Sequence, residues 1–391
     1  MAARVMYVVA GELSGDAHGA GLLRDLRGRI DGLEIHGAGG PAMAEVAGDG
    51  LEDWVADAAV MGAWEVVKRY GWFRKRFYRM LADVERLRPE VLVLIDYPGF
   101  NLRFAARVRE RLPDTRIIYY ISPQVWAWKK GRLPKMARLL DEMLCLFPFE
   151  QPIFEGAGLR TTWVGHPLVD ELEAARVPGV ERDPGLVGLF PGSREREVSR
   201  LLPAMVEAAA RLRAGRPQLR FAVPAASPEL GVLIRRMAGG ADWIEVGDGG
   251  SHDLMQRAGC AVVASGTATL EAAYYELPYC LVYAVAWPTY VLARMLVKIE
   301  HIGLVNILAG REVVREFIQA DAEPVALSRE LARLMDDETA RARLIEDLRE
   351  TTAKLGGSGA HERAAARVAA WFAENPRRAV AASPRRPVDP G

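Results

Sequence analysis

Cysteine is rare in this chain. The three cysteines, Cys145, Cys260 and Cys280, are far apart in the sequence and form no CxxC pair. Such a set supplies no disulfide framework and is typical of a protein from a reducing compartment. The six histidines are equally scattered, with no HExxH motif and no Cys/His cluster, so we expect neither a metal site nor a cofactor.

An excess of charge of either sign is also missing. Lys plus Arg and Asp plus Glu both number 51, so the formal net charge is zero. Without an overall positive field, we expect no nucleic-acid partner. The longest uncharged stretch, 277–293, is interrupted by Pro278 and Pro288 and falls short of the roughly 20 apolar residues of a membrane-spanning helix. The N-terminus lacks a signal-type segment, and we therefore expect a cytoplasmic protein.

The length of 391 residues favours two domains. Short β-branched runs alternate with amphipathic helical stretches in both halves, which predicts parallel sheets covered on both faces. In the first half the predicted strands are 5–10, 33–39, 91–96, 116–122 and 142–148. In the second half they are 186–192, 219–226, 242–247, 260–266 and 279–285.

The character of the sequence changes within 161–185, where Pro, Gly and charged residues cluster. We place the domain linker there and expect an α/β fold of two doubly wound domains, 1–168 and 169–374, on either side of a central cleft. The segment 375–391 is rich in Pro, Arg and Ala without periodicity, so we expect it to be a disordered tail.

Two predicted strands of the first half end at acidic residues. In AGELSGD, Glu12 lies in the turn after the first strand, with a spacing that is not GxGxxG. The alternative is a tight turn in which Ser14 or Asp16 caps a helix. In VLVLIDYPGFN, Asp96 ends a buried strand, where a carboxylate can act as a base with a shifted pKa. Its alternative role is to cap the following turn.

In the second half, LFPGSREREV brings Gly192, Ser193 and Arg194 to the start of a helix. Backbone N–H groups at a helix N-terminus, together with a guanidinium, suit a diphosphate. The alternative is a surface loop in which Arg194 pairs with Glu195 or Glu197.

A second polar turn follows in ASGTATLEA. Ser265, Gly266, Thr267 and Thr269 stand at a predicted helix start and suit a further phosphate contact. Glu271 comes shortly after, and its carboxylate can accept two hydroxyl hydrogen bonds from a ribose. The alternative is a capping pattern without a ligand.

The segment 60–80, VMGAWEVVKRYGWFRKRFYRM, concentrates basic and aromatic residues in a neutral chain. On a helical wheel, one face carries Val66, Tyr70, Phe73 and Phe77, and the opposite side carries Lys68, Arg69, Lys75, Arg76 and Arg79. A basic amphipathic helix of this kind lies in a membrane interface. The alternative is a helix whose apolar stripe faces the protein core.

Several strings resemble one known family. GELSGD, GAGGPAM, VMGAWEV, LIDYPGFN, YYISPQVWAWKKGR, FPFE, WVGHPLVD, LFPGSREREV and ASGTATLEA occur in the order and spacing of lipid A disaccharide synthase, a glycosyltransferase of the GT-B fold. GLVNILAGREVVREFIQ continues the similarity to residue 319. Nine ordered motifs are far more specific than any one of them.

The resemblance implies a reaction. UDP-2,3-diacylglucosamine would donate its sugar, with inversion, to the 6-hydroxyl of 2,3-diacylglucosamine 1-phosphate, giving a β(1→6) disaccharide 1-phosphate and UDP. It implies that Asp96 is the base, with Glu12 as an acceptor-orienting group or a rival base. It also implies that Arg194 binds the diphosphate and that Asn306 belongs to the donor site. DYPGFN departs from the family pattern at Tyr97 and Gly99, which leaves open whether a second carboxylate assists.

The acylated substrates favour the membrane interpretation of 60–80. The first domain would then hold the acceptor and dock on the cytoplasmic face of the inner membrane, and the second would bind the nucleotide sugar. A homodimer is an open alternative to a monomer. The rival functions are another UDP-sugar enzyme of the same architecture, either a UDP-N-acetylglucosamine transferase to a lipid or an epimerase, and a catalytically silent UDP-sugar-binding protein.

Overall fold

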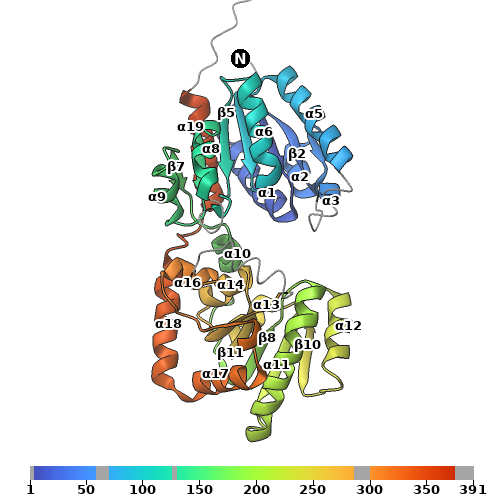
Figure 1. Cartoon of the computed structure of the whole chain (residues 1–391), viewed down its shortest axis with the longest axis vertical. Coiled ribbons are helices and arrows are strands. Elements are labelled where there is room, and N and C mark those ends of the chain that lie inside the picture. Colours follow the sequence, from blue (N-terminus) through green and yellow to red (C-terminus); the bar gives the residue numbers. More distant parts are fainter. Residues whose placement is uncertain (1–3, 59–69, 126–129, 286–299, 375–391) are drawn as a thin grey trace, which may run out of the picture.

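The computed structural model describes residues 4–58, 70–125, 130–285 and 300–374. These residues form two α/β lobes, each built on a twisted parallel sheet (Figure 1). The first sheet has seven strands in the order β3-β2-β1-β4-β5-β6-β7, and the second has six in the order β10-β9-β8-β11-β12-β13.

The first lobe alternates strands and helices along the chain. Its strands are β1 (Arg4–Ala10), β2 (Leu33–Gly39), β3 (Leu51–Asp53), β4 (Val91–Ile95), β5 (Arg116–Tyr120), β6 (Glu142–Cys145) and β7 (Thr161–Trp163). Its helices are α1 (Leu13–Arg27), α2 (Pro41–Ala47), α3 (Val55–Ala58), α5 (Tyr70–Leu87), α6 (Pro98–Arg111), η1 (Lys130–Arg132), α8 (Leu133–Leu139) and α9 (Glu150–Glu155).

The second lobe repeats the pattern. Its strands are β8 (Asp183–Phe190), β9 (Arg220–Ala225), β10 (Ile244–Asp248), β11 (Ala258–Ala264), β12 (Tyr279–Tyr283) and β13 (Glu316–Ile318). Its helices are α11 (Glu195–Gly215), α12 (Pro228–Met237), α13 (Ser251–Arg257), α14 (Thr267–Tyr274), α16 (Leu304–Ala309), η2 (Gln319–Asp321), α17 (Pro324–Asp336) and α18 (Glu338–Ala353). Two further helices are α10 (Leu168–Ala174), between β7 and β8, and α19 (Ala360–Glu374), after α18.

All ten predicted strands are present, and most are apolar runs that the sheet buries, whereas the edge strand β10 has one buried position. β4 is buried at all five positions, as expected for a central parallel strand. Three strands escaped prediction, β3, β7 and β13, and each has only three residues. Such runs are too short to show a period-2 pattern.

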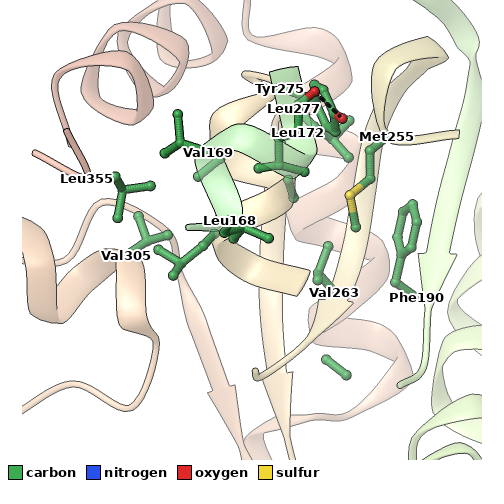
Figure 2. Close-up of a cluster of buried hydrophobic side chains, with 14 of the residues drawn as sticks. Leu168, Val169, Leu172, Phe190, Met255, Val263, Tyr275, Leu277, Val305 and Leu355 are labelled. Atoms are coloured by element: carbon green, nitrogen blue, oxygen red, sulfur yellow. Dashed lines mark hydrogen bonds between the residues drawn. The ribbon is translucent and has the colours of Figure 1, made fainter. Parts of the chain in front are cut away.

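The linker predicted within 161–185 contains structure of its own. It includes β7, α10 and the start of β8. α10 packs on the second lobe, where Leu168, Val169 and Leu172 are buried (Figure 2). The Tyr275 hydroxyl donates a hydrogen bond of 3.0 Å to the carbonyl of Leu172. The connection is therefore anchored in the second core.

The last helix returns to the first lobe. α19 packs against α1 and approaches β4 and β5 (Figure 1). Arg367 forms two hydrogen bonds of 3.0 Å with the fully buried carboxylate of Glu142 on β6, and Trp371 Nε1 donates to the same group at 2.5 Å. A Cβ on Gly21 of α1 would lie 2.5 Å from the His361 ring, so this glycine permits the close approach of α19. The predicted domain boundary at residue 168 assigned α19 to the second domain, whereas this helix packs on the first lobe. The boundary itself stays a prediction.

The strand orders decide where the loops meet. In each sheet the first strand is central, and the next strands are added on one side of it. The later strands are added on the other side, so the strand order reverses at a topological switch point. In the first sheet that point lies between β1 and β4, and in the second between β8 and β11. Loops after these paired strands diverge to opposite faces and leave space for a ligand.

Candidate active site

The two acids predicted in the first half end neighbouring strands. Ala10 of β1 is paired with Ile95 of β4, so Glu12 and Asp96 follow the two strands at the switch point. The negative charge of Glu12 raises the pKa of Asp96. Sheet topology therefore brings together two carboxylates that are 84 positions apart in the sequence.

The turn at Asp96 has an unusual backbone. Asp96 and Tyr97 both have positive φ values, 44° and 48°, a region that costs energy for residues other than glycine. The side-chain amide of Asn101 donates hydrogen bonds to the carbonyls of Ile95 (3.1 Å) and Asp96 (2.8 Å), and the Tyr119 hydroxyl donates to the Asp96 carbonyl. These bonds fix the strained turn and aim the carboxylate. Sequence reasoning missed the roles of Asn101 and Tyr119.

Burial, and to a lesser degree the negative charge of Glu12, raise the pKa of Asp96 to about 6, against a smaller opposing effect of a hydrogen bond from the Tyr97 N–H. A carboxylate with a pKa near neutrality is a stronger base than an ordinary aspartate and is still ionised at pH 7. The side chain is also partly accessible. Asp96 thus has the electrostatic profile of a general base.

Glu12 and Asp16 have different environments. Glu12 is exposed and occupies the N-cap position of α1 without a side-chain cap hydrogen bond. Asp16 is buried, and its carboxylate accepts hydrogen bonds from the N–H groups of Gly40, Ala42 and Met43 at 2.8–3.0 Å. Asp16 therefore anchors the start of α2, which leaves Glu12 as the free acid of the motif.

A pocket of about 640 Å³ opens at the switch point of the second sheet. The loop after β8 and the loop after β11 form its walls, because Phe190 and Val263 are paired in the sheet. Its lining includes the predicted residues Gly192, Ser193, Arg194, Ser265, Gly266, Thr267 and Glu271. The structure thus gathers seven of the nine predicted donor-site residues around one cavity.

Three helices, α11, α13 and α14, begin at this pocket. α11 has Arg194 and α14 has Gly266 as N-cap residue, and neither cap supplies a side-chain hydrogen bond. Gly192 and Gly266 have φ values of 107° and 147°, in the region that favours glycine. The first-turn N–H groups are therefore available to an anionic ligand, and the helix dipoles favour negative charge there.

Arg194 is exposed and pairs with Glu197 at 3.0 Å, as in the surface-loop alternative. Glu197 itself lines the pocket, and a Cβ on Gly192 would lie 2.5 Å from its carboxylate. An exposed pair of this kind contributes about 0–1 kcal/mol. The guanidinium can therefore exchange Glu197 for a diphosphate at little cost.

Glu271 faces His252 across the pocket. His252 Nε2 lies 3.3 Å from a carboxylate oxygen of Glu271, and both residues line the cavity. Burial raises the pKa of Glu271, while the interaction with His252 opposes that rise. His252 therefore helps to keep the carboxylate ionised and oriented. The sequence analysis did not select His252, and its position just after a Gly-Gly turn at a strand end was the available signal.

Two predicted donor-site residues have other tasks. The Thr269 hydroxyl donates to the carbonyl of Gly266 at 2.7 Å, and the residue is fully buried. Asn306 is also fully buried; its oxygen accepts from the N–H groups of Val313 and Val314, and its nitrogen donates to Val314 and Glu316. Neither residue lines the pocket, because their side chains form hydrogen bonds inside the fold. Their direct contact with the donor therefore stays a prediction.

The basic aromatic segment is only partly described. Val66 lies outside the described residues, and α5 begins at Tyr70. Phe73 and Phe77 are half-buried and pack against the first core, Phe73 beside Trp54 (ring centroids 6.5 Å apart) and Phe77 beside Phe100 (5.4 Å). Tertiary contacts thus cover part of the stripe, and a membrane-facing role for these two rings stays a prediction.

The basic side of α5 is also partly engaged. Arg76 is paired with Glu52 of β3, and Arg79 lies 3.4 Å from the same carboxylate. Lys75 remains exposed, as does Tyr78. The accessible surface of α5 thus includes the ring of Tyr78, which the helical wheel assigned to neither face.

Among residues 4–58, 70–125, 130–285 and 300–374, no three His, Cys, Asp or Glu side chains gather in a way that could hold a metal ion. In the same ranges no helix has the length and apolarity needed to cross a bilayer.

Known structures resemble this fold over its whole length. UDP-GlcNAc 2-epimerase from Neisseria meningitidis bound to UDP-GlcNAc matches with a TM-score of 0.57 and 10% identity, covering 95% of this chain and all of the other. The glycotransferase of kitacinnamycin matches with a TM-score of 0.56 and 18% identity, again over 95% and all of the two chains. The chain therefore has the GT-B architecture shared by glycosyltransferases and epimerases.

Comparison with sequences of known proteins identifies the family within this fold class. Residues 6–370 match the family model described as Lipid-A-disaccharide synthetase. The Lipid-A-disaccharide synthase of Trichlorobacter lovleyi is 41% identical over 370 residues, covering 93% of this chain and 96% of the relative. The protein is a glycosyltransferase. It belongs to the lipid-A-disaccharide synthase family, as the ordered motifs indicated.

Proposed function

We propose that this enzyme transfers the sugar of UDP-2,3-diacylglucosamine to the 6-hydroxyl of 2,3-diacylglucosamine 1-phosphate, with inversion at the anomeric carbon. Membership of the family supports formation of the lipid A disaccharide. The observation that carries the proposal is Asp96, a carboxylate with its pKa raised to about 6, held in a strained turn at a switch point. A single base without a covalent intermediate is what inversion requires.

In the proposed reaction, the acceptor hydroxyl attacks the anomeric carbon while Asp96 takes its proton. The bond between that carbon and the diphosphate oxygen breaks, and UDP leaves with the bonding electron pair. Glu12 holds the acceptor sugar or acts as a rival base. Its negative charge also helps to raise the pKa of Asp96, which supports a division of labour between the two acids.

The second-lobe pocket supports binding of the donor. The N-termini of α11 and α14 and the guanidinium of Arg194 balance the charge that develops on the diphosphate as UDP leaves. Ser193, Ser265 and Thr267 contribute polar contacts, and Glu271, oriented by His252, accepts hydrogen bonds from the ribose hydroxyls.

An epimerase is the closest rival, because UDP-GlcNAc 2-epimerases share the fold. The test is incubation with the two acylated glucosamine substrates, followed by mass spectrometry for the disaccharide 1-phosphate and UDP. A parallel reaction with UDP-GlcNAc alone checks for the 2-epimer. Epimer without disaccharide would reject the proposal in favour of the rival, and bound UDP-sugar without turnover would indicate a silent binding protein.

Peripheral attachment to the cytoplasmic face of the inner membrane is part of this proposal. Exposed Tyr78 and Lys75 on α5 support it, since a ring and a basic side chain on one helix suit an anionic interface. Tyr78→Ser combined with Lys75→Glu should weaken flotation with anionic vesicles without lowering the melting temperature. Phe77→Ser, which alters a packed ring, should instead lower the melting temperature. Equal flotation of wild type and the double variant would contradict membrane docking.

A further inference from the structure

A groove runs along the first lobe between α5 and α6, with Lys135 of α8 at its edge. Its volume is about 730 Å³, within the range of pockets that bind small ligands. The groove is separate from the donor pocket, which lies in the second lobe.

Aromatic rings form the apolar part of the groove. They are Phe73, Phe77, Tyr78, Tyr97 and Phe100. The rings follow one another in contact: the centroids of Phe77 and Phe100 are 5.4 Å apart, and those of Phe100 and Tyr97 are 6.1 Å apart. Because Tyr97 directly follows Asp96, this row of rings extends from α5 to the catalytic turn. Ala106 of α6 also lines the groove, with a side chain of a single methyl group.

The edge of the groove is positively charged. Arg74, Arg103, Arg107 and Lys135 line it, with Glu110 as the single acid in the lining. Arg107 pairs with Glu110 at 2.7 Å. Within the part of the chain that the structure describes, Arg103 and Lys135 have no acidic partner. An apolar channel with an unbalanced basic edge is complementary to an anionic lipid.

We propose that this groove binds one acyl chain of the acceptor lipid, with the basic edge attracting the lipid's negative charge. The inference rests on the proposed function, because it takes Asp96 as the base at the acceptor hydroxyl. The groove and Asp96 share one turn, so a headgroup placed at Asp96 directs a chain over Tyr97 and Phe100. A water-soluble acceptor would need no aromatic channel at that place.

The groove makes a quantitative prediction about chain length. Each methylene that enters it should improve kcat/KM by about fourfold. The gain should stop once the groove is full. A membrane that merely concentrates the lipid would give a gain that continues with chain length, so the assays contain neither vesicles nor detergent and use acceptors below their aggregation limit.

The test variant is Ala106→Trp, which fills the groove from α6 without removing a core side chain. It should reach its plateau at a shorter chain and lower the ratio of kcat/KM for long-chain over short-chain acceptors by at least tenfold. The matched control is Arg111→Trp, the same ring on the exposed side of the same helix, outside the groove. The control should keep the wild-type profile. Thermal melts verify that both variants fold.

A second variant tests the groove independently, in case Ala106→Trp does not fold. A Cβ on Gly99 meets no atom within 4 Å, and Gly99 lines the groove, so Gly99→Leu adds volume there with no clash at its Cβ. It should shift the plateau in the same direction. Identical chain-length profiles for wild type and both groove variants would overturn the inference.

A binding assay separates this inference from the proposed reaction. The affinity of a dansyl-labelled undecanoic acid, measured by fluorescence titration, should fall at least tenfold in Ala106→Trp and remain unchanged in the control. If no acceptor of any length is turned over, the proposed function fails, and the fluorescence result decides about the groove alone. The inference fails if Ala106→Trp binds the probe as tightly as wild type does. It also fails if this variant loses vesicle binding but keeps the wild-type chain-length profile.

Discussion

The switch points of the two sheets present opposite kinds of site. In the first lobe, Asp96 is largely buried, its backbone is strained, and two side chains fix its turn. In the second lobe, Arg194 is exposed and paired with a glutamate that it can release, at a cavity bounded by glycines and helix starts. The first site resembles a group prepared for proton transfer, and the second an open receptor for an anion. From this comparison we propose that chemistry and binding energy reside in different lobes.

The largest expected effect follows from removing the base. Asp96→Asn keeps the shape of the side chain but cannot accept the proton, so kcat should fall by about 10²–10⁴-fold. Binding of UDP to the other lobe, measured by calorimetry, should stay within about twofold of wild type. If the variant keeps more than about a tenth of wild-type kcat, Glu12 becomes the candidate base.

The pH profile of the wild type tests the same assignment. A base with a pKa of about 6 is deprotonated above that value, so kcat/KM should be level at higher pH and decline about tenfold per pH unit below it. Glu12→Gln should move the inflection to lower pH, because a negative charge near Asp96 is lost. An inflection that stays in place would show that the two acids do not interact.

The next effect should appear in the second lobe. Arg194→Ala removes a charged hydrogen-bond donor worth about 1.5–3 kcal/mol, so the Kd of UDP should rise by about 10–100-fold. Arg194→Lys should recover only part of this, because it lacks the planar fork. Arg196→Ala is the matched control, since Arg196 is exposed on α11 and does not line the pocket. Equal losses in both alanine variants would indicate a long-range charge effect.

A smaller effect concerns stability. The pKa of Asp96 is raised in the folded state, so the folded protein binds its proton more tightly than the unfolded chain. Keeping this group ionised therefore destabilises the fold above pH 6, by up to about 3 kcal/mol, and the cost disappears below about pH 4. Asp96→Asn should raise the melting temperature at pH 8 and not at pH 4. A lower melting temperature at pH 8 would mean that the carboxylate stabilises its turn.

The smallest expected effect distinguishes binding from chemistry within the second lobe. His252→Ala removes the partner that opposes the raised pKa of Glu271, so the donor KM should rise about threefold to tenfold, a change of about 1 kcal/mol. The rise should be greater at pH 6 than at pH 8, because Glu271 must be ionised to accept ribose hydrogen bonds. His252→Gln can still donate a hydrogen bond and should restore part of the affinity. A fall in kcat at unchanged KM would assign His252 to the chemical step instead.

The sequence by itself determined the ten main strands and the residues that end them. Parallel strands buried on both faces are apolar throughout, so polar residues at their ends stand out, as Glu12, Asp96 and Arg194 do. Ordered motifs likewise revealed the family. These features are local in the chain, and that is why they can be read without coordinates.

Only the tertiary structure decided which side chains are free to act. Thr269 and Asn306 resemble ligand contacts in the sequence, but partners from the fold use their hydrogen bonds. Phe73 and Phe77 resemble a membrane face in the sequence, but contacts with Trp54 and with α6 leave both rings half-buried. His252 contacts Glu271 only because the fold brings the two residues within 3.3 Å of each other. Burial and hydrogen-bond competition depend on neighbours distant in the chain, and only the strand order of each sheet brings those neighbours together.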